Sequence, residues 1–113
     1  LEDEKLMDAV TALSGSGPAY VFLLAETMAA AGHRLGLPAD MAMQLAIETI
    51  KGAGALMAED TAPPSTLREN VTSKGGTTAA ALSVLMSDER MAGLLDEALT
   101  AAARRAAELD TQG

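Results

Sequence analysis

The amino-acid sequence predicts an all-α domain. Apolar residues recur with the helical period along the chain, and no segment alternates between apolar and polar residues as a strand does. Nearly half of the 113 residues are apolar (49%), which is enough for a single packed domain spanning residues 1–113. Only 2% are aromatic, so the core has to be built from Leu, Met, Val, Ile and much Ala. Alanine loses no side-chain entropy in a helix, and this composition therefore favours closely packed helices.

The composition also excludes several classes of protein. The formal net charge is −8 and the basic residues form no cluster, which argues against nucleic-acid binding. There is no cysteine, which excludes a disulfide scaffold and any thiolate metal site, and no metal site is expected. The longest uncharged stretch, residues 9–25, is interrupted by Ser and Gly and cannot span a membrane. The chain starts without Met or a signal peptide, so we expect it to be a piece of a longer protein.

Two helices are expected in the first third of the chain. Residues 3–13 carry a short amphipathic pattern, which the segment Ser14–Pro18 interrupts. Ser16 is the expected N-cap of a long second helix, with Gly17 and Pro18 in its first turn. Between residues 19 and 32 this helix is apolar almost all round, which predicts that a neighbouring subunit covers part of it.

A third helix follows a Gly and Pro pair. Gly36 ends the second helix and Pro38 begins the third, which is expected to run to Glu59. Gly52 and Gly54 lie inside this helix, and each costs about 1 kcal/mol relative to Ala. These glycines predict another backbone passing close by.

The second half is expected to hold three more helices. Residues 61–64 form a loop, and Thr66 with Glu69 predicts a capping box at the start of a short helix. A helix from Thr77 to Met86 follows a glycine turn, and Ser87 is the expected N-cap of the final helix. That final helix is expected to have Asp88 and Glu89 in its first turn, Arg104 and Arg105 in later turns, and a buried stripe of Met91, Leu94, Leu95, Ala98, Ala102 and Leu109.

The segment from Ser73 to Thr78 is the best candidate for a binding site. It places a pair of glycines before a helix whose first turn exposes unpaired N–H groups and a partial positive charge. A carboxylate or phosphate could approach those groups, and Ser73, Thr77 and Thr78 could add hydrogen bonds. The residues alone leave a second interpretation open, in which a threonine caps the helix and the glycines only form the turn.

This segment resembles the signature of the pyrroline-5-carboxylate reductases, Leu-x3-Val-x-Ser-Pro-Gly-Gly-x-Thr followed by a small residue and Leu. The matching positions are Leu67, Val71, Ser73, Gly75, Gly76, Thr78, Ala81 and Leu82. The segments Leu13–Tyr20 and Gly36–Pro38 are also similar to the family, as is the closing helix with Glu97, Ala98, Arg104 and Arg105. The likeness covers essentially residues 5–110. Lys74 departs from it because the family usually has proline there, and Met86 replaces a frequent acidic or amide residue.

The resemblance implies a fold, a reaction and partners. It implies an interlocked helical dimerisation domain of about five to six helices, with the family's Rossmann domain absent from this chain. The reaction would be reduction of 1-pyrroline-5-carboxylate to L-proline by NADPH or NADH, bound chiefly by that missing N-terminal domain. It also implies a cytoplasmic homodimer, and some family members form larger rings of dimers.

The resemblance further implies roles for individual residues. Backbone amides around Gly76, Thr77 and Thr78, together with Ser73, would bind the substrate carboxylate, and Gly75 belongs to the same substrate-binding turn. The Thr78 hydroxyl would act catalytically by holding the ring nitrogen. Hydride transfer to a protonated imine needs no protein nucleophile, which agrees with a chain that has one His and no Cys.

Two alternatives stay open beside this hypothesis. The chain could be a non-catalytic dimerisation module, or the helical domain of a related dehydrogenase acting on hydroxy acids. The Gly15–Gly17 segment follows no strand and does not indicate a Rossmann site. Arg68 and Lys74 could attract anions but are expected to be ordinary surface charges, as are Glu59 and Asp60. His33 is expected to interact with the dipole at the end of the second helix.

Overall fold

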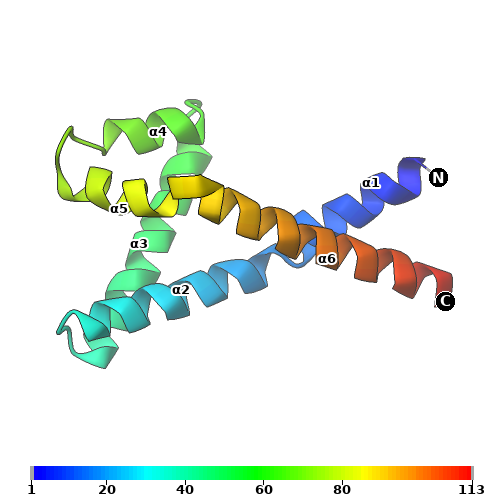
Figure 1. Ribbon diagram of the computed structural model, residues 1–113, viewed down its shortest axis with the longest axis horizontal. Helices are drawn as coiled ribbons and strands as arrows, with labels where there is room; N and C mark the ends of the chain where they lie inside the picture. The colour runs from blue at the N-terminus through cyan, green and yellow to red at the C-terminus, as the bar shows by residue number, and fades with distance from the viewer. Residues whose placement is uncertain (1, 113) are drawn as a thin grey trace. The chain divides into compact units, whose positions relative to one another are not determined.

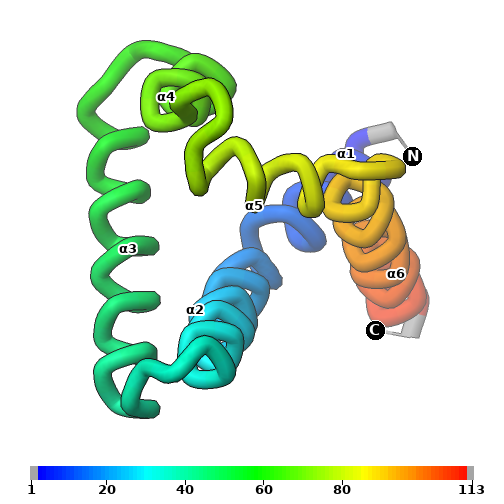
Figure 2. Tube along the Cα trace, turned by 60° about the vertical axis from the view of Figure 1, so that its left-hand side comes forward, coloured from blue at the N-terminus to red at the C-terminus, as the bar shows by residue number. Residues whose placement is uncertain are grey.

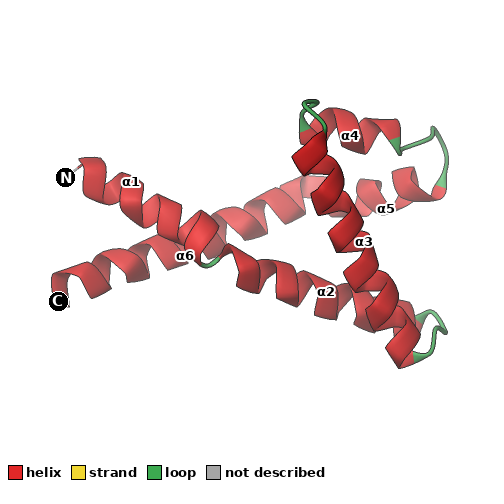
Figure 3. Ribbon diagram, turned by 180° about the vertical axis from the view of Figure 1, so that it is seen from behind, coloured by secondary structure: helices red, strands yellow, loops and turns green. Residues whose placement is uncertain are grey.

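A computed structural model describes residues 2–112, and within that range it consists of helices and loops without a strand (Figures 1 and 3). The helices are α1 (Glu2–Val10), α2 (Gly17–Arg34), α3 (Ala39–Glu59), α4 (Pro64–Asn70), α5 (Thr77–Leu85) and α6 (Arg90–Gln112). A π-helical turn (Thr11–Gly15) follows α1, and a 3-10 turn (Ser87–Glu89) precedes α6. The predicted all-α class is confirmed. No described helix is long and apolar enough to cross a membrane.

The chain divides into two compact units, each of which has its own contacts. The terminal unit consists of the described residues of Leu1–Pro18 and Ser73–Gly113, and the central unit of Ala19–Thr72. In the central unit, Ala29 of α2 packs with Ala42 and Ala46 of α3, and all three are buried. In the terminal unit, α1 and the π-helical turn pack on α6, and Ala12 of that turn is 2% exposed. Small side chains at these positions let the helices approach closely.

α2 ends in a turn that leads into α3 (Figure 2), and backbone hydrogen bonds in the central unit define this end. Gly36 has a φ of 112°, its N–H donates to the His33 carbonyl (3.0 Å), and the Leu37 N–H donates to the Gly32 carbonyl (3.2 Å). This pattern is a Schellman motif, which satisfies the last carbonyls of the helix. Pro38 then precedes the first residue of α3. The predicted boundary between the second and third helices is confirmed.

The predicted break at residues 14–18 is a change of helix type. Ser16 has helical dihedral angles (φ −85°, ψ −15°), and its N–H donates to the Thr11 carbonyl at 2.9 Å. It therefore closes the π-helical turn and does not have the extended conformation of an N-cap. The prediction that Ser16 caps α2 was wrong because the backbone stays helical through the glycines by taking one extra residue into the turn.

The predicted capping box of α4 is also absent. The helix begins at Pro64, and the Thr66 N–H donates to the Pro63 carbonyl at 2.9 Å, so Thr66 lies inside the first turn. Proline at the first helical position has a fixed φ suited to a helix and has no N–H that needs a partner. That preference starts the helix before Thr66 and Glu69 can form the box.

The start of α6 differs from the expected one. The Ser87 hydroxyl donates backward to the Val84 carbonyl (2.8 Å), so it does not cap α6. Asp88 and Glu89 have φ values of 53° and 54° and precede the helix, which begins at Arg90. The left-handed conformation costs a residue with a side chain about 1–2 kcal/mol. The left-handed conformation of these two residues interrupts the right-handed helix, so α6 begins as a separate helix after α5.

The apolar stripe predicted to be buried on α6 is mostly exposed within the chain. Leu94 is 68% exposed, and Met91, Leu95, Ala98 and Leu109 are exposed as well, whereas Ala102 is half-buried. The covered face of α6 consists instead of the half-buried residues Leu99, Ala102, Ala103 and Ala106. The prediction placed the larger side chains inward, but α1 and the π-helical turn cover the alanine-rich face.

Two carboxylates approach each other where α1 meets the end of α6. The pKa of half-buried Asp8 is raised above its usual value by partial desolvation, by a hydrogen bond with Asp110, and by the charges of Asp110 and Glu4. The folded chain therefore binds a proton at the Asp8 carboxyl more tightly than the unfolded chain does. Protonation of Asp8 stabilises the fold at acidic pH, and this stabilisation is lost as the pH rises through the raised pKa.

Replacement of Asp8 by Asn should consequently raise the melting temperature at neutral pH, since it removes one of the repelling charges. The gain should shrink as the pH falls below the usual aspartate pKa, where the wild-type carboxyl is protonated. Thermal unfolding followed by circular dichroism across this pH range measures both effects. Asp3→Asn, a charge removal on the same helix, is the control. Equal pH profiles for the two variants would contradict the assignment to the Asp8–Asp110 pair.

Candidate functional site

A tight turn precedes α5. The Gly76 N–H donates to the Ser73 carbonyl at 3.0 Å and closes a four-residue turn. Gly75, the third residue of the turn, has a φ of 74°, whereas Lys74 before it does not have a positive φ. A positive φ at the third position alone defines a type II turn. The predicted glycine turn is confirmed, and it directs the chain into the first turn of α5.

The two glycines of the turn are needed for different reasons. Gly75 supplies the left-handed backbone conformation. Gly76 is extended (φ −89°, ψ −175°), a conformation open to any residue, but a Cβ there would overlap the Ser73 hydroxyl and lie 3.3 Å from the Ser73 carbonyl. The Ser73 hydroxyl therefore lies directly beside the residue that precedes α5.

No side chain caps the N-terminus of α5. Its N-cap is Gly76, which has no side chain to accept a hydrogen bond, and the Ala80 N–H is the first to bond back to the Gly76 carbonyl (3.1 Å). The amides of Thr77, Thr78 and Ala79 lie in the first turn, where the helix offers no acceptor. The interpretation that a threonine caps this helix was wrong. The first turn instead presents backbone donors and the positive end of the helix dipole.

The structure brings all five predicted site residues together. Ser73, Gly75 and Gly76 form the turn, while exposed Thr77 and half-buried Thr78 begin α5. The Gly76 amide is already bonded within the turn, so the free donors at this position are the Thr77, Thr78 and Ala79 amides and the hydroxyl groups. Lys74 is exposed in the same turn, and none of the described acids forms an ion pair with it.

The other residues considered from the sequence have structural roles. The His33 Nδ1 lies 2.8 Å from the Leu37 carbonyl oxygen, so the imidazole bridges the turn after α2. The Asp60 carboxylate accepts the Ala62 N–H at 2.8 Å and orders the loop before α4. Within residues 2–112, no three His, Cys, Asp or Glu residues gather where they could hold a metal ion.

Sequence reasoning missed an apolar groove in the central unit. The groove lies between α3 and α4 and is lined by Gly52, Ala53, Leu56, Met57, Pro64, Leu67, Arg68 and Val71. A Cβ at Gly52 or Gly54 would meet nothing within 4 Å, so within residues 2–112 no backbone passes close to either glycine, contrary to the prediction for this helix. The four-residue spacing of Leu67 and Val71 was a signal that α4 presents an apolar face to α3.

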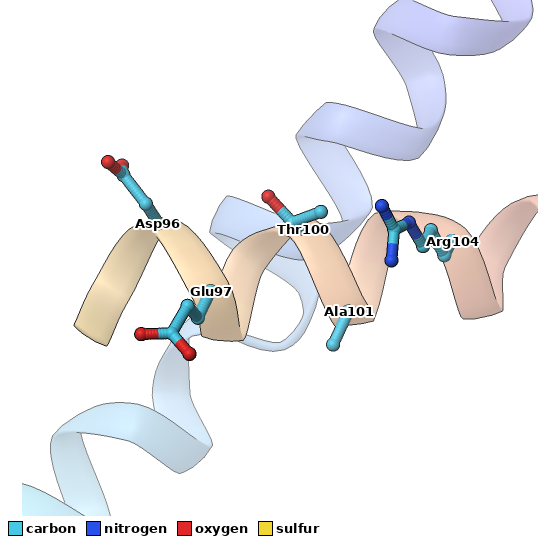
Figure 4. A pocket seen from close by; sticks show the side chains of 5 residues that line it. All are labelled: Asp96, Glu97, Thr100, Ala101 and Arg104. Atoms are coloured by element: carbon cyan, nitrogen blue, oxygen red, sulfur yellow. The ribbon is translucent and has the colours of Figure 1, made fainter. Parts of the chain in front are cut away.

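A second hollow in the terminal unit carries no identifiable chemistry. It is lined by Asp96, Glu97, Thr100, Ala101 and Arg104, all of which belong to α6. Asp96, Thr100 and Arg104 project from one side of the helix, while Glu97 and Ala101 project from the other (Figure 4). Side chains of a single helix cannot enclose a ligand, and we assign no site to them.

Comparison with known proteins places this chain in a family of dimerisation domains. The family profile described as "Pyrroline-5-carboxylate reductase dimerisation" matches residues 4–109, nearly the whole chain. The chain therefore belongs to this family of dimerisation domains. It is 46% identical over 107 residues to the pyrroline-5-carboxylate reductase of Arabidopsis thaliana, covering 95% of this chain and 38% of that protein. It is likewise 46% identical over 112 residues to the Pseudomonas aeruginosa enzyme, covering 99% and 41%.

Solved structures agree with the sequence comparison. A pyrroline-5-carboxylate reductase of Coxiella burnetii is similar with a TM-score of 0.88 and 43% identity, over 93% of this chain and 38% of that one. A pyrroline carboxylate reductase of Plasmodium falciparum, solved with NADP bound, is similar with a TM-score of 0.84 and 35% identity, over 90% of this chain and 38% of that one. The chain thus spans about two fifths of the length of the curated relatives it matches.

The left-handed conformation of Gly75 leads to a stability prediction. Gly75→Ala should lower the free energy of unfolding by about 1–2 kcal/mol, because a Cβ is strained at a φ of 74°. Gly75→Asn should cost less, since Asn tolerates this conformation better than Ala does. Chemical denaturation of both variants measures the difference. An alanine variant as stable as wild type would show that the turn does not hold this conformation in solution.

Proposed function

We propose that this chain is the dimerisation and substrate-contacting domain of a pyrroline-5-carboxylate reductase. The reaction is the reduction of 1-pyrroline-5-carboxylate to L-proline with NADPH or NADH. One observation of the structure carries the proposal: a glycine turn leads into an uncapped helix N-terminus flanked by three hydroxyl groups. Membership of the family named for this reductase supports it.

The first role proposed for this site is to bind the substrate carboxylate. The Thr77 and Thr78 amides are unpaired donors at the positive end of α5, and the Ser73 hydroxyl lies beside Gly76. Together they provide donors for both oxygens of a carboxylate. These donors are fixed by the helix and the turn, so binding requires little rearrangement of the backbone.

The second role is to orient the reacting imine. The Thr78 side chain is half-buried in the first turn of α5, next to the proposed carboxylate site. Its hydroxyl would hydrogen-bond the ring nitrogen and fix the C=N bond. The positive charge of a protonated imine makes the adjacent carbon electrophilic. The chain therefore has to position the substrate and does not have to supply a nucleophile.

The described residues carry no Rossmann fingerprint for a dinucleotide. Gly15 and Gly17 are the only glycines spaced as in a Rossmann fingerprint near a helix start, yet they lie in and after a π-helical turn and follow no strand. We propose that NADPH or NADH, which supplies the hydride, is bound chiefly by a domain outside this chain. The fragment alone is then expected to be inactive, and a cytoplasmic location stays a prediction.

Thr78→Ala in the full-length protein tests the catalytic role. Loss of one hydrogen bond to a charged group costs about 1.5–3 kcal/mol, which corresponds to a fall in kcat/KM of roughly 10- to 100-fold. Thr78→Ser keeps the hydroxyl and should retain most of the activity. Steady-state oxidation of the nicotinamide cofactor measures both variants, and light scattering checks that they keep their oligomeric state. Unchanged kinetics in the alanine variant would falsify the role of Thr78.

A second function, compatible with the first, is dimerisation. Phe22 and Leu23 of α2 are 67% and 59% exposed, and large apolar side chains are exposed on α1, α3 and α6 as well. Burying one such side chain contributes about 1.5–3 kcal/mol. We propose that a second copy of the chain covers these faces in a homodimer, and that dimers could associate further into rings.

Light scattering behind a sizing column tests this arrangement. The chain should elute as a dimer at micromolar concentration, and Phe22→Asp should shift it toward monomer because a buried unpaired charge is unfavourable. Glu26→Asp on the same helix keeps the surface character and serves as control. A wild-type chain that is a stable, folded monomer at micromolar concentration would overturn the proposal.

A related dehydrogenase acting on hydroxy acids is the less favoured alternative. Such an enzyme needs an acid or base beside the reacting carbon. The one histidine, His33, bonds to the Leu37 carbonyl in the turn after α2, and the only ionisable group in the turn before α5 is the exposed Lys74. The reductase proposal needs no acid or base at this position, so it accounts for the site with fewer required groups.

A further inference from the structure

One residue dominates the charge of the segment that forms the proposed site. From Asn70 to Ser87 the only charged residue is Lys74, and it is positive in a chain whose net charge is −8. Lys74 is exposed at the second position of the Ser73–Gly76 turn, and no described acid forms an ion pair with it. Its charge is therefore not neutralised by a neighbour.

The turn keeps the backbone of Lys74 close to the first turn of α5. The ends of a closed β-turn lie within about 7 Å of each other, and here the Ser73 carbonyl and the Gly76 N–H are hydrogen-bonded at 3.0 Å. Lys74 lies between them, directly before the residues that carry the free amides. Charges separated by less than a Debye length, about 8–10 Å at moderate ionic strength, attract or repel each other appreciably.

We propose that Lys74 makes the site selective for anionic imines, by adding a full positive charge to the partial charge of the α5 N-terminus. This inference rests on the proposed function, which places the substrate carboxylate at that N-terminus. A domain with a net charge of −8 repels an anionic substrate at long range, and an unpaired lysine at the binding turn offsets this repulsion locally. Lys74 is thus a specificity-determining residue that acts through charge.

The charge of the carboxylate fixes which kinetic constant Lys74 affects. The carboxylate keeps its charge from substrate through transition state to product, so Lys74 stabilises all three about equally. Uniform stabilisation lowers KM and leaves kcat nearly unchanged. Inhibition by L-proline, which carries the same carboxylate, should weaken in parallel with substrate binding when the charge is removed. A cyclic imine without a carboxylate, 1-pyrroline, lacks the group that Lys74 attracts, so its binding should not weaken when the charge is removed.

The test compares Lys74→Met, Lys74→Arg and wild type in the full-length enzyme, with 1-pyrroline-5-carboxylate and 1-pyrroline as substrates. At low salt, Lys74→Met should raise KM for the carboxylate substrate about two- to fivefold, as expected for one exposed charge interaction. High salt should remove most of this difference. The inhibition constant of L-proline should rise by a similar factor, whereas KM for 1-pyrroline should not rise. Lys74→Arg should behave like wild type.

Lys5→Met is the matched control, because it removes the same charge from α1, which packs on α6 and the π-helical turn. Equal changes for both imines would mean that Lys74 acts on the turn's conformation, and an unchanged KM would mean that its charge is irrelevant; either result overturns the inference. A wild-type enzyme that reduces neither imine would overturn the proposed function instead. The two failures are therefore distinguishable.

Discussion

The helices of this chain carry more apolar side chain than the chain itself can cover. Four alanines (Ala12, Ala29, Ala42 and Ala46) are the only buried residues among those whose burial the structure describes. Burying a methyl group contributes less than about 1 kcal/mol, while ordering one residue's backbone costs about 1–2 kcal/mol. Such a core cannot by itself hold six helices. The remaining apolar faces need a covering surface, which agrees with membership of a family of dimerisation domains.

The geometry of the candidate site depends little on whether these apolar faces are covered. The turn is closed by one backbone hydrogen bond. Its path depends on the left-handed backbone conformation of Gly75 and on the absence of a side chain at Gly76. α5 then supplies its donors through its own geometry, since the first turn of any uncapped helix leaves N–H groups free. Local backbone chemistry thus places the site, while distant apolar contacts stabilise the domain that carries it.

The difference between local backbone chemistry and distant apolar contacts explains how much could be predicted from the sequence. Local signals were sufficient for the all-α class, for the end of α2 at Gly36 and for the glycine turn that leads into α5. They failed where two local preferences compete: Pro64 starts α4 before the Thr66 box can form, and the Ser87 hydroxyl bonds backward to Val84. The prediction of a buried apolar stripe on α6 was wrong for another reason. Side-chain size does not reveal whether a face meets its own chain or something outside it.

The glycine pair has a consequence for how this turn can change during evolution. Position 75 resists substitution because of a dihedral angle, and position 76 because of a neighbouring hydroxyl. A smaller residue in place of Ser73 would remove the closest contact of a side chain at 76, yet nothing nearby could relax the requirement for a left-handed backbone at 75. A paired change can therefore admit a side chain at position 76, whereas position 75 is restricted to glycine, or at some cost to Asn, as long as the turn exists. Lys74, held by neither constraint, is the position at which the loop is free to vary its charge.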